Sequence, residues 1–200
     1  MKKLIHLFLI FYSLNINAQN IKEKLNNINT IEEAEKFVSD NPELTPEIYT
    51  ISPEIDPIHI PAYFKKIKVG YIFNENEYIF KVLSVTKENA FHVSCVYIDG
   101  NKLSIDNINN LRHQIISAYL EGKKFSDLAL EFTMDGNLDG DLIWTEGMMD
   151  PEFENAVKIH NKRDIFTVDI PTKKRYYVTL KTHDDIEATV ITILKVKNSS

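Results

Sequence analysis

Apolar and polar positions in the first part of the chain favour a short helix and then an irregular segment. Residues 31–38 place apolar side chains on one helical face, and Thr30 and Glu33 have the spacing of a capping box. The pattern predicts a helix that ends before Pro42. Five prolines lie between that position and residue 61, so this stretch is predicted to be an extended, irregular connector.

A β-hairpin is predicted after the connector. Residues 68–73 and 78–83 are rich in β-branched and aromatic side chains, and the polar residues 74–77 between them favour a turn. Residues 19–89 are therefore predicted to form a lead-in made of a helical segment, a Pro-rich connector and a β-hairpin.

The second half of the chain, residues 90–197, alternates between strand and helix patterns. Strands are predicted at 91–98, 141–144, 164–168, 175–181 and 189–196, and helices at 105–121, 125–132 and 151–160. This mixed order, with an antiparallel hairpin near its end, predicts an α+β domain.

The N-terminus has the pattern of a secretory signal peptide. Two lysines follow Met1, residues 4–12 are apolar except for His6, and Ala18 is a small residue at the end of the stretch. The apolar run is much shorter than the roughly 20 residues that span a bilayer. We therefore expect residues 1–18 to be removed near Ala18, leaving an exported protein in the periplasm or the medium without stable membrane insertion.

Composition narrows the chemistry that the chain is expected to carry. The net charge is −6 with acidic and basic residues interspersed, which does not favour a nucleic-acid surface. A single cysteine, Cys95, cannot form an intramolecular disulfide. The six histidines include no H-x-x-x-H pair with a nearby acid, so no metal and no cofactor is predicted.

Four sequence blocks in the second half carry a family resemblance. They are LEGKKFSDLA at 120–129, FTMD at 132–135, DGDLIW at 139–144 and EGMMDPEFENA at 146–156. In this order they resemble the segments G-x-x-F-x-x-L-A, S-x-D/C, G-G-D-L-G-W and G-x-M-x-P-x-F-x-x-A of parvulin-type peptidyl-prolyl isomerases (PpiC-like domains). The resemblance covers about half of the chain and implies a parvulin-like small antiparallel sheet surrounded by helices.

The resemblance implies an apolar pocket for a proline ring. By matching position, Leu142, Met149 and Phe153 would form it, and Met149 and Phe153 are four residues apart across a helix start, so both can face one side. The alternative is that these three are ordinary core residues. Asp135 matches the position that is Asp or Cys in the family, where a carboxylate would bias the electrostatics around the isomerising amide; alternatively, Asp135 and Gly136 form a turn.

The chain departs from the family at its two histidine positions. Cys95 stands in the place of the first histidine and Tyr177 in the place of the second. Both side chains bear a donor and an acceptor, so the two are expected to be able to share a hydrogen bond. His92 lies three residues before Cys95 and, by strand alternation, is expected on the opposite face.

Two further departures lie near the expected pocket. Ile143 stands where the family has glycine, which would narrow the cleft or alter the strand, and Asp139 replaces the first glycine of a pair.

The sequence thus supports three hypotheses of function. The first is a prolyl isomerase that acts on proline-containing segments of unfolded or nascent exported proteins. The second is a catalytically weak or inactive parvulin-like chaperone or peptide-binding module. The third is a thiol-dependent role of Cys95, although a cysteine in a strand is usually a small buried apolar residue. The pattern does not predict an oligomeric state.

Overall fold

A computed structural model describes residues 21–198, with the side chains of residues 62 and 63 excepted. The predicted signal peptide, residues 1–18, lies outside the described residues. The described chain divides into two compact units: unit 1 contains residues 21–87 and 189–198, and unit 2 contains residues 88–188. Among residues 21–198, no helix is long and apolar enough to cross a membrane.

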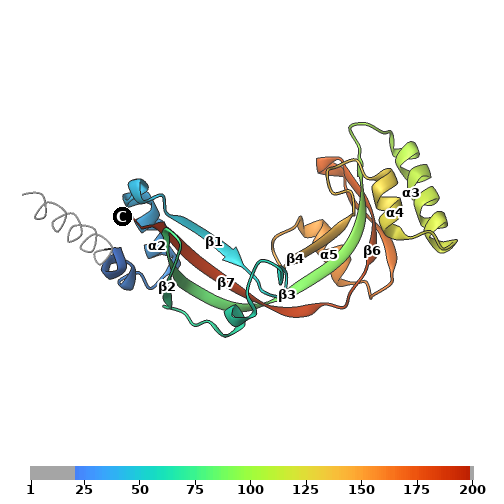
Figure 1. The fold of residues 1–200 in the computed structure, drawn as a ribbon. Helices are drawn as coiled ribbons and strands as arrows, with labels where there is room; N and C mark the ends of the chain where they lie inside the picture. The colour runs from blue at the N-terminus through green and yellow to red at the C-terminus, as the bar shows by residue number, and fades with distance from the viewer. Residues whose placement is uncertain (1–20, 199–200) are drawn as a thin grey trace, which may run out of the picture. The chain divides into compact units, whose positions relative to one another are not determined.

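The described chain contains seven strands, four α-helices whose bounds are given below, and the helical residues 21–26 (Figure 1). The strands are β1 (Glu47–Ile51), β2 (Ile72–Glu75), β3 (Tyr78–Asp99), β4 (Asp141–Thr145), β5 (Ile165–Ile170), β6 (Arg175–Lys181) and β7 (Ile186–Lys197). The helices are α2 (Ile31–Asp40), α3 (Ile105–Leu120), α4 (Phe125–Phe132) and α5 (Pro151–Lys158), and short 3₁₀ turns are η1 (Pro42–Leu44), η2 (Ala62–Lys66) and η3 (Pro171–Lys173). The strand order is β1-β7-β3-β6-β5, and β2 and β4 also pair with β3. The predicted α+β fold class is confirmed.

Strand β3 is 22 residues long and contributes to both units. The sequence pattern predicted two strands, 78–83 and 91–98, whereas the structure continues the strand through residues 84–90. Five of those seven residues are polar, so the sequence pattern did not indicate a strand there. A polar side chain of this stretch makes a cross-strand hydrogen bond: the Ser84 hydroxyl donates to Thr192 Oγ1 on β7 at 2.8 Å.

Unit 1 has apolar clusters on both faces of its strands. The predicted capping box of α2 is confirmed: Thr30 Oγ1 accepts from the Glu33 amide at 3.2 Å, and Glu33 Oε2 accepts from the Thr30 amide at 3.3 Å. The first cluster gathers Ile21, Leu25, Ile28, Ala34, Phe37, Leu44, Ile79, Leu83, Leu194 and Val196. The second gathers Phe64, Phe80, Val82, Ile191 and Ile193.

Two predictions for the lead-in need correction. The Pro-rich connector is not irregular throughout, because it contains β1, whose Ile48 is opposite Leu194 of β7. This pairing partner is almost 150 residues away in sequence, so local pattern could not reveal it. The β2–β3 hairpin is present, but its turn is the two-residue Asn76-Glu77 step with Asn76 at φ 53°, rather than all of residues 74–77.

Unit 2 places helices on both faces of β3 and β6 (Figure 1). α3 and α4 cover the face that carries Val96, Ile98 and Val178. α5 covers the other face, where its cluster gathers Phe91, Val93, Trp144, Phe153, Val157, Phe166, Val168 and Ile170. The division into units leaves the strand predicted at 189–196 with unit 1, where it is the central part of β7.

Gly140 fixes the entry of β4 beside β3. Its carbonyl accepts from the Cys95 amide at 2.8 Å, and its φ is +71°. A Cβ added at Gly140 would lie 2.6 Å from the Cys95 carbonyl oxygen and 2.8 Å from the Ala129 Cβ. Both the backbone conformation and the space therefore require glycine at this position.

Replacing Gly140 with alanine is expected to destabilise the protein by at least about 2 kcal/mol, because a left-handed φ is unfavourable for alanine and the methyl group would meet main chain. Urea denaturation of the purified variant measures this. Gly136→Ala is the matched control, since a Cβ there meets nothing within 4 Å and its φ lies outside the left-handed region. Equal unfolding midpoints for the two variants would contradict the proposed constraint.

Candidate functional site

The candidate site lies on the face of β3 and β6 that packs against α5. Tyr97 and Tyr177 are direct partners in the antiparallel register, so their side chains share one face. Cys95 lies two residues before Tyr97 and therefore shares it too. The sequence analysis singled out Cys95 and Tyr177 but missed Tyr97, which the period-two alternation of the strand could have revealed.

Aromatic rings form a continuous series across this face. Tyr97 and Tyr177 have ring centroids 5.5 Å apart, and Tyr177 meets Phe153 of α5 edge-on at 4.9 Å. Phe153 contacts Trp144 at 5.7 Å, and Trp144 contacts Phe91 at 5.6 Å. Tyr97 and Tyr177 are half-buried, whereas the other three rings are buried. The series thus has a partly accessible end at the two tyrosines.

The three residues predicted to form the proline pocket lie in one apolar cluster. Phe153 is 1% exposed, while Leu142 and Met149 are half-buried and pack against the same cluster as Tyr177. Phe153 is therefore a core residue in this structure, and the surface available to a ligand comes from Leu142, Met149 and the tyrosines.

Cys95 and Tyr177 keep their protons at neutral pH. Burial raises the pKa of the Cys95 thiol to about 12, with smaller contributions from the carboxylates of Asp135 and Asp141. Burial also raises the pKa of Tyr177 to about 12. The two groups are close enough to interact electrostatically, but the hydrogen bond expected between them is not among the contacts of the described residues. The site therefore presents neutral hydroxyl and thiol groups.

Asp135 lies in the loop between α4 and β4 and is exposed. Its Oδ1 accepts from the Thr133 hydroxyl at 2.9 Å and from the Asn137 amide at 3.1 Å, so it organises the turn that was the alternative interpretation. Burial is the main cause of the raised pKa values of Cys95 and Tyr97, and the Asp135 carboxylate adds a smaller contribution to both. The turn interpretation is therefore supported by these hydrogen bonds, and the role of Asp135 beside an isomerising amide stays a prediction.

His92 lies away from the site. Its Nε2 is 2.7 Å from Asp141 Oδ1, and its ring stacks on His183 with centroids 4.1 Å apart. Ile143 is the register partner of His92 and so shares that opposite face, which means that Ile143 does not narrow the surface beside Leu142. Asp139 Oδ1 accepts from the Asp141 amide at 3.1 Å and shapes the entry to β4.

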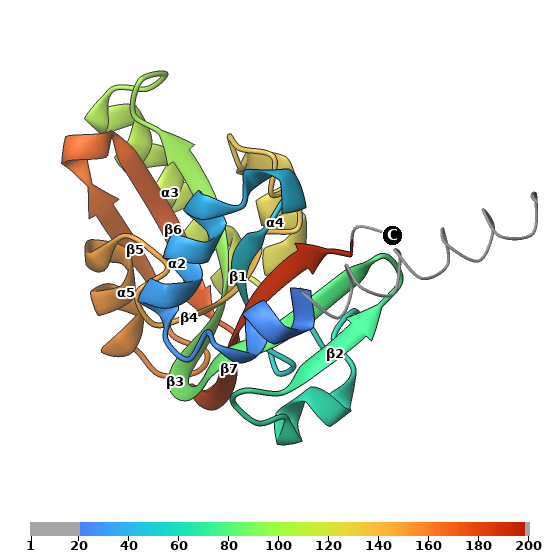
Figure 2. The same ribbon diagram turned by 90° about the vertical axis from the view of Figure 1, so that its left-hand side faces the viewer.

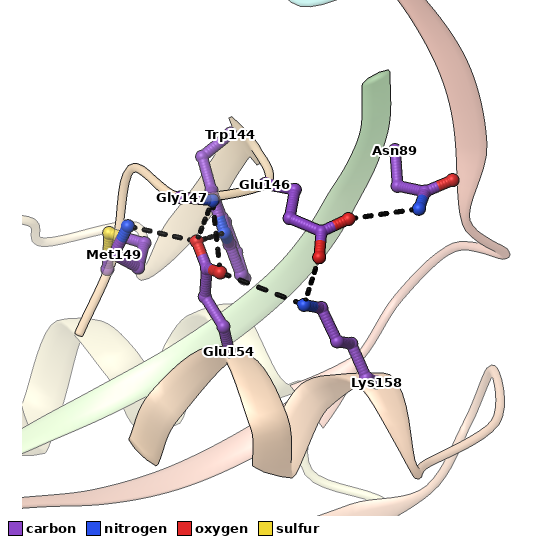
Figure 3. Close-up of polar contacts among 7 residues, drawn as sticks. All are labelled: Asn89, Trp144, Glu146, Gly147, Met149, Glu154 and Lys158. Carbon is purple, nitrogen blue, oxygen red and sulfur yellow. Dashed lines mark hydrogen bonds and ion pairs between the residues drawn. The ribbon is translucent and has the colours of Figure 1, made fainter. Parts of the chain in front are cut away.

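Glu154 holds the loop that carries Met149, and the sequence analysis missed it. Its side chain comes from α5 (Figure 3), and the residue is 5% exposed. It accepts from Trp144 Nε1 at 3.2 Å, from the Gly147 amide at 2.9 Å and from the Met149 amide at 3.0 Å. Glu154 thereby ties α5 to the end of β4 and sets the position of the Met149 backbone.

A second, more exposed network lies beside Glu154 in Figure 3. Lys158 Nζ is 4.0 Å from Glu154 Oε2 and also donates to Glu146, which in turn accepts from the Asn89 side chain at 3.0 Å. These bonds lower the pKa of the Glu146 carboxyl. They link α5 to β3 at the end of the loop.

Within residues 21–198, no group of three or more His, Cys, Asp or Glu side chains is arranged to hold a metal ion. A scan against models of known protein families finds no match for the chain, and a search of curated proteins finds none either.

Replacing Glu154 with glutamine is expected to lower the free energy of unfolding by about 1–3 kcal/mol. At present Glu154 Oε2 accepts a hydrogen bond from the Gly147 amide, whereas the side-chain NH₂ of glutamine would place a second donor against that amide. Urea denaturation at neutral pH measures the effect. Glu152→Gln, an exposed residue on the same helix, is the control and should change stability by less than about 0.5 kcal/mol. A Glu154→Gln variant as stable as the control would show that the buried carboxylate does not hold the loop.

The raised pKa of Cys95 predicts an unreactive thiol. At pH 8 its thiolate fraction is on the order of 10⁻⁴, against roughly a quarter for an ordinary cysteine, and burial adds a barrier to access. Ellman's reagent should therefore label the native protein at least about 100-fold more slowly than the urea-unfolded chain. A Cys95→Ala, Ser126→Cys variant, whose new thiol is on an exposed position of α4, should be labelled rapidly. Rapid labelling of Cys95 in the native protein would contradict this prediction and would support the hypothesis of a thiol-dependent role.

Proposed function

We propose that unit 2 is a parvulin-type prolyl isomerase domain, which binds proline-containing segments of exported proteins and speeds their folding. The observation that carries the proposal is the convergence of Leu142, Met149 and Phe153 with Tyr177 in one cluster. Leu142 comes from one motif block and Met149 and Phe153 from the next, while Tyr177 comes from β6. Their meeting on one face is what a proline-binding site requires. The requirement for glycine at Gly140, inside one of the blocks, supports the same interpretation.

Prolyl isomerisation requires tighter binding of the transition state than of the ground states, and it does not require a nucleophile. Rotation about an amide faces a barrier of about 18–20 kcal/mol, and a catalyst lowers it by binding the twisted amide better than either planar form. Leu142 and Met149 would contact the proline ring. The neutral hydroxyls of Tyr97 and Tyr177 would donate to the twisted amide, and Asp135 would set the local field.

A second candidate is a peptide-binding module or chaperone with weak or no catalysis. The specific observation in its favour is the chemistry of Cys95 and Tyr177, which stand at the family's histidine positions and stay neutral with pKa values of about 12. Such a site would keep the apolar contacts to proline while lacking imidazole groups. Both candidates share the same partners, namely extended proline-containing segments, and the same place of action outside the inner membrane.

Activity separates the two candidates. A protease-free assay on a panel of X-Pro peptides is expected to show isomerisation by the unmodified protein above the uncatalysed rate of one event in tens to hundreds of seconds. If the unmodified protein binds the peptides but only the Cys95→His, Tyr177→His variant accelerates isomerisation, the second candidate replaces the first. Absence of both binding and catalysis would refute both.

Met149→Ala is expected to lower kcat/KM by roughly tenfold, since it removes a half-buried apolar contact to the ring worth about 1–3 kcal/mol. Met148→Ala is the matched control, because Met148 is the neighbouring residue and is 65% exposed. Unfolding midpoints of the two variants should be compared, so that a loss of fold is not taken for a loss of contact. Equal kcat/KM values for the Met149→Ala and Met148→Ala variants would show that the proline ring does not contact Met149.

A further inference from the structure

Unit 1 contains a surface pocket that the proposed function does not use. The pocket has a volume of about 320 Å³, at the lower end of the range for ligand sites, and is lined by Lys66, Ile67, Lys68 and Tyr71. All four residues come from one short stretch that runs from the last residue of η2 to the start of β2, so the pocket is built within unit 1.

The backbone of this stretch is held in a defined shape. The Tyr71 amide donates to the Lys68 carbonyl at 3.1 Å, and Gly70 has φ +82°, as in a type II turn. The Gly70 amide also donates to the Val82 carbonyl at 2.9 Å. The turn brings the side chains of Lys68 and Tyr71 to the same pocket and anchors them to β3.

Tyr71 is supported by an aromatic stack. Its ring lies on Phe73 with centroids 5.8 Å apart, and Phe73 lies on Phe80 at 5.0 Å, while Phe64 meets Phe73 edge-on at 5.8 Å. Tyr71 is nevertheless 54% exposed. One ring face is thus packed, and the side chain still offers apolar surface to a ligand.

The pocket is positively charged in a chain whose net charge is −6. Lys65 is 3.6 Å from Glu54, whereas within residues 21–198 neither Lys66 nor Lys68 takes part in an ion pair. Two exposed ammonium groups beside Ile67 and Tyr71 fit a ligand that has a carboxylate next to an apolar group.

The pocket adjoins an open strand edge. β2 follows directly after Tyr71 and pairs only with β3 in the described sheet (Figure 2). Val82 donates to the Tyr71 carbonyl at 2.9 Å, and because antiparallel bonding alternates along a strand, the amides of Ile72 and Asn74 face the open edge. Such an edge binds an extended peptide through main-chain hydrogen bonds.

We propose that unit 1 carries a second polypeptide-binding site, in which an extended segment with acidic and apolar side chains adds alongside β2. An acidic side chain lies between Lys66 and Lys68, and an apolar one packs on Ile67 and Tyr71. The site requires no proline and does not rest on isomerase activity in unit 2.

The test uses the purified protein and a fluorescein-labelled nine-residue peptide without proline, in which glutamate alternates with valine or leucine. Fluorescence anisotropy should show saturable binding, and the same peptide with lysine in place of each glutamate should bind at least tenfold more weakly. A glutamate peptide N-methylated at alternate amides keeps its side chains but cannot pair with β2, and it should also lose at least tenfold in affinity.

Protein variants locate the binding. The double substitution Lys66→Glu, Lys68→Glu should lower the affinity for the glutamate peptide at least tenfold. Lys36 is an exposed residue on α2, and Lys36→Glu should change the affinity less than twofold. Tyr71→Ala should weaken binding about fivefold and Tyr71→Phe should leave it unchanged. Circular dichroism of each variant checks that the fold is kept.

Three results would overturn the proposal. The first is no saturable binding of the glutamate peptide to the unmodified protein. The second is an equal loss of peptide affinity in the Lys36→Glu variant and in the Lys66→Glu, Lys68→Glu variant, which would indicate unspecific electrostatic attraction. The third is displacement of the peptide by decanoate together with no effect of N-methylation, which would assign the pocket to an anionic amphiphile instead.

Discussion

The close approach of the Gly140 main chain to Cys95 is the contact on which the candidate site depends. It places β4 against β3, and β4 then directs Leu142 and Trp144 toward the face that α5 covers. From there the buried carboxylate of Glu154 joins the end of β4 to α5 and fixes the loop between them. A shift at the first contact would therefore be passed along β4 to every apolar group of the site, because packed elements move as bodies rather than deforming locally.

The helices of unit 2 were predictable because their signals are local. Ser104 caps α3, and Pro151 begins α5, so both starts could be located from sequence. The continuity of β3 and the presence of β1 were not predictable, since polar residues 84–90 and a proline-flanked pentapeptide become strands only through partners far away in sequence. Strand formation depends on cross-strand pairing more than on intrinsic preference.

The candidate site shows the same division between local and distant information. The motif spacing in the sequence identified Cys95, Tyr177 and the apolar residues of the expected proline pocket as candidates. Strand alternation correctly predicted that His92 lies on the opposite face. Glu154 could not be recognised in this way, because a carboxylate on an amphipathic helix is usually solvated. Only the folded chain shows three donors converging on it. The resulting site has apolar side chains with the neutral Cys95 and Tyr177 at its centre, while the charges of Asp99, Arg175 and Asp135 act on Tyr97. Under the proposed function, this arrangement would suit binding of a neutral imide bond better than proton transfer.

Unit 2 is an insertion within the sequence of unit 1, entered through β3 and left through β7. β7 lies between β1 and β3 in the strand order, so β1 has no strand partner, and the β2–β3 hairpin is not joined to β1, until β7 is made. During synthesis from the N-terminus, the complete sequence of unit 2 is available before unit 1 can close its sheet. The order of folding is therefore built into the chain: the inserted unit can form from its own contacts, and the enclosing unit is completed by the final twelve-residue strand.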